Sequence, residues 1–114
     1  MTEERKLVTV LFADVVGSTT MAAEHDAEVV RATLDGAFDR VAAVVRDHGG
    51  TVEKFIGDAV MAVFGVPVAH DDDAERALRA AVAIREIVRA ASTRIPLDVR
   101  IGVTTGSARS SSVN

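Results

Sequence analysis

The chain has 114 residues, a formal net charge of −4 and no cysteine, and its apolar 48% consists mainly of Ala and Val. This length suits one domain, and the absence of cysteine excludes a disulfide scaffold, a cysteine-based zinc site and a thiol nucleophile. The acidic balance argues against a nucleic-acid partner, whose protein surface would be basic. No apolar run approaches the ~20 residues of a transmembrane segment and residues 1–4 do not resemble a secretory signal, so we expect a cytoplasmic protein.

The first half of the chain predicts a strand, a helix and a pair of strands. Residues 7–14 are β-branched and apolar and predict a buried central strand. Residues 26–47 repeat apolar positions with a helical period, and the glycines within 48–50 mark the end of that helix. Residues 51–56 and 59–64 predict two strands joined by a two-residue hairpin turn.

The second half predicts one helix and one strand. The acidic run 71–73 opens a helix with an apolar face, and Asp72 with Glu75 fits a capping box. Pro96 blocks continuation of the helix, and residues 97–103 predict a fourth strand. The order β-α-β-β-α-β predicts an α+β, ferredoxin-like fold, in which an antiparallel sheet carries two helices on one face.

This topology brings two distant carboxylates together. Right-handed crossovers leave room for the third strand beside the first and antiparallel to it. Asp14 ends the first strand and Asp58 immediately precedes the third, so both are expected at one edge of the sheet.

Two neighbouring aspartates repel each other unless they are protonated or neutralised by a cation. Hard oxygen ligands of this kind suit Mg²⁺ or Mn²⁺, which often take substrate phosphates as further ligands. The loop 15–20 can present backbone N–H groups to those phosphates. The pattern therefore predicts a metal-dependent nucleotide site, whereas an aspartate at a strand end, taken alone, is most often a simple turn former. The acidic run 71–73 beside His70 is explained as a helix start favoured by the helix dipole.

Three segments resemble the class III nucleotidyl cyclase catalytic domain, which comprises the adenylyl and guanylyl cyclases. They are residues 11–19 (LFADVVGST), 53–64 (EKFIGDAVMAVF) and 100–106 (RIGVTTG), in this order and with a helical segment in each gap. The resemblance covers residues 5–106 and identifies that range as a cyclase domain, followed by a Ser-rich tail over 107–114 that we expect to be disordered.

The resemblance implies roles for individual residues. Asp14 and Asp58 would be the catalytic carboxylates that bind two Mg²⁺ or Mn²⁺ ions, with the Val15 carbonyl as a further metal ligand. Lys54 falls where adenylyl-type members place the lysine that reads adenine, and guanylyl-type members typically have Glu there. The residues implied around the triphosphate of ATP are Phe12, Gly17, Ser18 and Thr19.

The resemblance also implies a reaction and a partner. It predicts conversion of ATP into cyclic AMP and pyrophosphate at the interface of a homodimer, or of a pair with a complete cyclase domain. The family's later segment, with its second base-reading residue and its transition-state Asn and Arg, has no counterpart here. We therefore expect these 114 residues to be inactive alone. The alternative is a non-catalytic domain of the same fold that binds metal or nucleotide, or that pairs as a regulatory half.

Overall fold

The structure, a computed structural model, describes residues 3–17, 23–56, 59–91 and 97–111. The elements in chain order are β1 (Glu3–Gly17), α2 (Ala27–Asp47), β2 (Thr51–Ile56), β3 (Ala59–Phe64), α3 (Asp73–Ala91) and β4 (Leu97–Ser111). The four strands form one antiparallel sheet in the order β2-β3-β1-β4. This order confirms the predicted ferredoxin-like fold, including the third strand beside the first.

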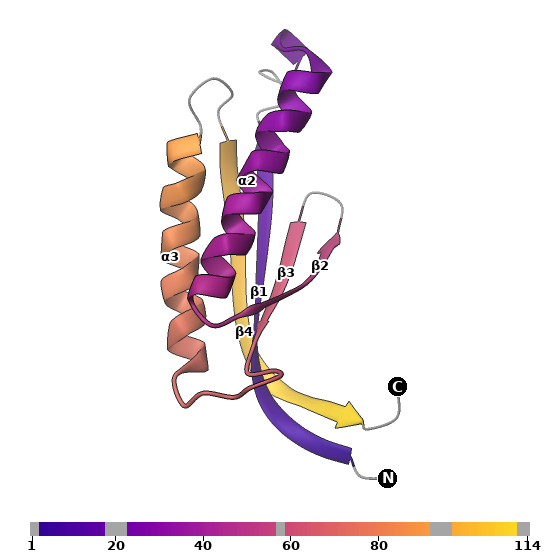
Figure 1. The fold of residues 1–114 in the computed structure, drawn as a ribbon, viewed down its shortest axis with the longest axis vertical. Helices are drawn as coiled ribbons and strands as arrows, with labels where there is room; N and C mark the ends of the chain where they lie inside the picture. Colours follow the sequence, from indigo (N-terminus) through magenta and orange to yellow (C-terminus); the bar gives the residue numbers. More distant parts are fainter. Residues whose placement is uncertain (1–2, 18–22, 57–58, 92–96, 112–114) are drawn as a thin grey trace.

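Both helices cover the same face of the sheet, as Figure 1 shows. Alternate side chains of β1 point toward the helices, and Leu11, Ala13 and Val15 are buried with at most 1% of their surface exposed. They join the helix side chains in a single core of aliphatic and phenylalanine residues. Because side chains alternate along a strand, the even-numbered residues of β1 lie on the sheet face that carries no helix. We call this the open face.

Helix α2 begins and ends at the residues that the sequence indicates. The carboxylate of Asp26 accepts a hydrogen bond from the Glu28 backbone N–H and caps the first turn. At the other end, Gly49 has a φ of 85°, and the Gly50 N–H donates to the Val45 carbonyl at 2.9 Å. This is the Schellman ending that a glycine after the last turn provides. It turns the chain directly into β2.

The start of α3 differs in detail from the predicted capping box. The Asp72 carbonyl accepts the first helical bond, from the Arg76 N–H, so Asp72 does occupy the cap position. Its carboxylate, however, accepts from the Arg76 guanidinium at 2.7 Å. This hydrogen bond lowers the pKa of Asp72 and raises the pKa of Arg76.

Among the described residues, no helix combines the length and the apolar character needed to cross a membrane.

Strands β1 and β4 are longer than the sequence predicts. Their ladder runs from Gly17 opposite Leu97 to Glu3 opposite Ser111, and its far end curves away from the helices (Figure 1). The sequence predicts an end to the last strand at Val103 and a disordered tail over 107–114. Residues 107–111 instead belong to β4, while 112–114 lie outside the described residues. Polar and small residues form this end of the ladder, so hydrophobic periodicity gives no sign of it.

Candidate functional site

Asp14 lies on the open face, near the carboxyl end of the central strand β1. It is partly exposed, whereas its neighbours Ala13 and Val15 are buried beneath the helices. A carboxylate in this position is held by a rigid strand and still reaches solvent. The open face therefore presents an acidic group that a ligand can approach.

The register places two residues beside Asp14. Across β3 its partner is Ala59, and across β4 its partner is Arg100. Directly opposite residues of an antiparallel pair share a face of the sheet, so Arg100 also lies on the open face, and it is exposed. Asp58, the other predicted carboxylate, lies outside the described residues. Its chain neighbour Ala59 is the β3 residue opposite Asp14, as the predicted topology requires.

Beyond Asp14, the strand β1 has a partner on one side only. The pairing with β3 ends at Asp14, while the pairing with β4 continues through Val15 to Gly17. Among the described residues, the backbone of residues 15–17 therefore has no strand beside it on the side where β3 pairs with the rest of β1. This arrangement is compatible with the Val15 carbonyl as a metal ligand. The predicted phosphate-binding residues Ser18 and Thr19 follow at once but lie outside the described residues.

A second row of residues crosses the sheet next to the row of Asp14. Phe12 stands opposite Met61 on β3 and Gly102 on β4, and Met61 in turn stands opposite Lys54 on β2. The Phe12 side chain is 41% exposed on the open face. The backbone of Lys54 therefore lies about 10 Å across the sheet from β1, two strand spacings away.

A β-bulge decides this position of Lys54. The β2–β3 register shifts between Val52 and Lys54, so Glu53 is the extra residue. Without that shift, Glu53 would stand opposite Met61 and Lys54 would stand opposite Val60, a buried core residue. Bulges commonly occur next to functional sites, where they re-aim one residue of a strand. The sequence did not predict this one.

Only part of the predicted set of metal ligands lies among the residues that the structure describes. Asp14 supplies a hard oxygen ligand, and Val15 can supply a carbonyl. Within the described ranges no group of three or more His, Asp or Glu side chains gathers to hold a metal. Asp58, the second carboxylate of the predicted pair, lies outside the described residues.

Arg100 is a candidate site residue that sequence reasoning missed. It lies on the same face as Asp14, and no ion pair joins these two described residues. An exposed guanidinium suits phosphate oxygens, which it can bind with two parallel hydrogen bonds. The signal was available in principle, because alternation along the predicted strand 97–103 separates Arg100 from its apolar neighbours.

The comparisons with known proteins identify the class of this chain. A family model described as the adenylate and guanylate cyclase catalytic domain matches residues 1–113. The chain belongs to this family, which confirms the resemblance seen in the three sequence segments.

Individual relatives agree with this assignment. Adenylate cyclase 1 of Rhizobium meliloti is 37% identical over 110 residues, which cover 91% of this chain and 16% of that protein. The adenylyl cyclase CyaB of P. aeruginosa has a TM-score of 0.80 and 31% identity, covering 96% of this chain and 60% of that one. A dimeric guanylyl cyclase domain from the fungus Blastocladiella emersonii has a TM-score of 0.79 and 30% identity, covering 94% and 61%. The chain thus spans about three fifths of the solved domains that it resembles.

Proposed function

We propose that this chain contributes the metal-binding side of an adenylyl cyclase site, which converts ATP into cyclic AMP and pyrophosphate. The observation that carries the proposal is the position of Asp14. It lies on the open face of the sheet, opposite the β3 residue that follows Asp58 and beside Arg100. The chain belongs to the nucleotidyl cyclase family, and Asp14 offers a carboxylate of the kind that binds divalent metals. Together these two observations favour a nucleotide site at this edge of the sheet.

Each residue has a defined task in this proposal. Asp14 and Asp58 hold two Mg²⁺ or Mn²⁺ ions, with the Val15 carbonyl as a further ligand. Phe12, Gly17, Ser18 and Thr19 surround the triphosphate, and Arg100 binds phosphate oxygens from the neighbouring strand. When bound, the divalent ions favour ionisation of the ribose 3′-hydroxyl and offset the charge of the triphosphate. The residues orient the nucleotide so that these groups meet in line.

The reaction needs no nucleophile from the protein. The 3′-oxygen of ATP forms a bond to the α-phosphorus, and the bond from that phosphorus to the pyrophosphate oxygen breaks. The 3′-hydroxyl proton passes to water. The nucleophile and the leaving group both belong to ATP, so the chain has only to bind, align and neutralise.

Lys54 is proposed to read the adenine ring in the site of a second subunit. Within one chain its backbone is two strands away from Asp14, so the two residues serve different parts of the site. The open face, which no described helix covers, is the surface on which we propose that the second copy or a complete cyclase domain pairs. The reaction consumes ATP, which the cytoplasm supplies, and we place the protein there.

Metal binding is the first experiment. Calorimetric titration with Mn²⁺ should show binding that Asp14→Asn weakens at least about tenfold, because it removes a charged ligand. Asp39→Asn is the matched control, since Asp39 is an exposed aspartate on α2 and the same charge is lost. Equal binding by the wild type and Asp14→Asn would contradict the assignment of Asp14.

Catalysis is tested by complementation. The chain is mixed with the P. aeruginosa cyclase domain whose own metal-binding aspartates have been replaced by asparagine. Cyclic AMP should form in the mixture and should depend on Asp14. If Mn²⁺ binds but the mixture makes no product, the non-catalytic alternative is favoured.

A further inference from the structure

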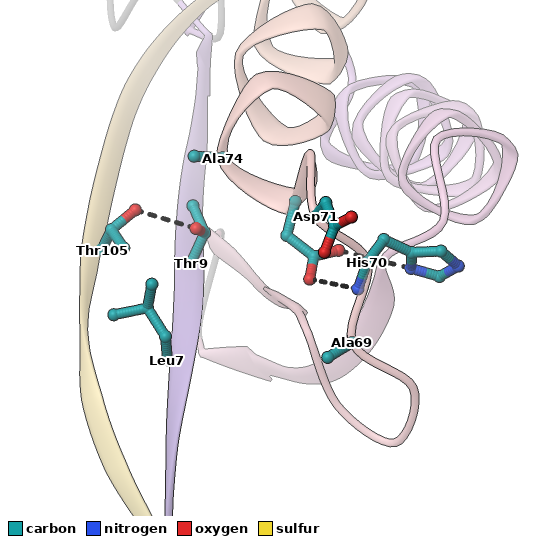
Figure 2. Close-up of a pocket in the computed structure, with 8 residues that line it drawn as sticks. Leu7, Thr9, Ala69, His70, Asp71, Ala74 and Thr105 are labelled. Atoms are coloured by element: carbon teal, nitrogen blue, oxygen red, sulfur yellow. Dashed lines mark hydrogen bonds and ion pairs between the residues drawn. The ribbon is translucent and has the colours of Figure 1, made fainter.

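A cavity lies on the helix-covered face of the sheet, away from Asp14. It has a volume of about 420 Å³, is open to solvent on one side and is lined by β1, β4, the start of α3 and the loop that leads into it. In Figure 2, Thr9 and Thr105 line it from the strands, and His70 and Asp71 line it from the loop. Cavities of this size commonly hold small molecules. No role in the cyclase proposal uses it.

The wall of this cavity carries negative charge. Asp71 and Asp73 both line it, and the described lining residues include no Lys or Arg. The positive end of the α3 dipole amounts to about half a charge, which two carboxylates outweigh. The cavity therefore favours a cation.

Asp73 has unused hydrogen-bonding capacity. Its side chain is only 10% exposed, and its Oδ2 accepts from the His70 backbone N–H at 2.8 Å. Its Oδ1 is buried and has no hydrogen-bond partner. The His70 Nδ1 lies 3.4 Å from Oδ1, within ion-pair distance but without a hydrogen bond. A buried carboxylate oxygen without a donor is costly, so a donor in the cavity would be stabilised there.

The remaining wall decides what kind of cation fits. Leu7, Ala69 and Ala74 provide apolar surface, and the Thr9 and Thr105 hydroxyls are 2.8 Å apart. One hydroxyl donates to the other, and each oxygen keeps a lone pair that can accept a hydrogen bond from a ligand. The described residues hold no group of three or more metal-ligating side chains, which argues against a bare metal ion. An ammonium group on a short aliphatic chain matches both the charge and the apolar wall.

We propose that this cavity is a binding site for a small protonated primary amine. The ammonium group lies toward Asp73 and Asp71, and the aliphatic part contacts Leu7 and Ala74. The site is separate from the proposed cyclase site: Thr9 and Asp14 are five residues apart on β1, about 17 Å along the strand, and lie on opposite faces. Its test therefore does not depend on the cyclase proposal.

The experiment uses butylammonium as the probe and butan-1-ol as its neutral counterpart. Titration into the ¹⁵N-labelled chain at neutral pH should give saturable amide shifts at Thr9, His70, Ala74 and Thr105. Butanol should bind at least about tenfold more weakly, because a charge-assisted hydrogen bond is lost. Absence of saturable butylammonium shifts, with an ordered water alone satisfying Asp73, would overturn the proposal. Equal binding of the two probes would overturn it as well.

Two variants localise the binding. Asp73→Asn keeps the shape of the side chain and removes its charge, and we expect at least tenfold weaker binding. Ala74→Leu fills the cavity from an exposed helix position that accepts leucine, so it should block the probe while the chain stays folded. Asp39→Asn, on the exposed side of α2, should bind like the wild type. Unchanged affinity in Ala74→Leu would place the amine elsewhere and refute the assignment.

Discussion

The same substitution should have opposite effects at two glycines. A Cβ atom at Gly50 would lie 2.6 Å from the Phe64 Cζ and 2.9 Å from the Val45 Cγ1. Phe64 and Val45 are fully buried in the core. At Gly36, in the exposed part of α2, nothing lies within 4 Å of an added Cβ. Gly50→Ala and Gly36→Ala thus make the same substitution in two settings, a crowded site between α2 and β2 and an open site within α2.

The magnitudes follow from the contacts. Carbon atoms pack at about 3.5–4.0 Å, so Phe64 would have to move by roughly 1 Å within a close-packed core. Overpacking of this kind costs about 1–3 kcal/mol of the free energy of unfolding. Alanine at Gly36 should instead stabilise by about 0.5–1 kcal/mol, because alanine loses less backbone entropy in a helix. The two variants should therefore differ by about 1.5–4 kcal/mol.

Urea unfolding followed by far-UV circular dichroism measures this difference. Dichroism is the appropriate signal, since the chain has no tryptophan or tyrosine. The midpoint should fall for Gly50→Ala and rise for Gly36→Ala, with the same slope in both. A Gly50→Ala variant as stable as the wild type would show that the Phe64 ring is not confined as the structure has it, and would refute the reasoning.

Three further predictions concern charged residues. Asp72→Asn should lower the free energy of unfolding at neutral pH, because the Arg76 hydrogen bond holds the pKa of Asp72 below its ordinary value. The stabilisation from this hydrogen bond is fully present above the ordinary pKa of Asp72. It is lost as the pH falls through the lowered pKa. In acid unfolding curves the two proteins should therefore converge once the pH lies below the lowered pKa of Asp72, and a difference that persists in stronger acid would contradict this origin. Arg100→Gln should strengthen Mn²⁺ binding a few-fold, because it removes a positive charge beside Asp14, and should weaken binding of the Mn²⁺–ATP complex. Calorimetry with each ligand measures both effects. Weaker binding of Mn²⁺ alone would refute the predicted charge effect on the metal. Lys54→Glu should sharply reduce cyclic AMP formation in the complemented mixture, and undiminished use of ATP would remove Lys54 from base recognition.

Local chemistry determined much of the fold from the sequence. The predicted strands 51–56 and 59–64 agree with β2 and β3, and the predicted helix 26–47 agrees with α2 and its Asp26 cap. Apolar period, capping residues and glycine endings act within a few residues of the chain, so a sequence displays them directly. The order of these elements then limited the topology to the observed sheet, and with it the position of Asp14 beside the start of β3.

Other features were decided by pairing between strands. The bulge at Glu53 determines that Lys54, and not Glu53, stands opposite Met61. No local pattern in the sequence of β2 predicts this bulge. The polar end of the β1–β4 ladder exists because two strands pair there, although neither segment has an apolar face of its own. Arg100 likewise stands opposite Asp14 only because of the register of those strands. Register is a relation between segments distant in the sequence, set by the packing of the whole sheet, so tertiary structure alone determines it.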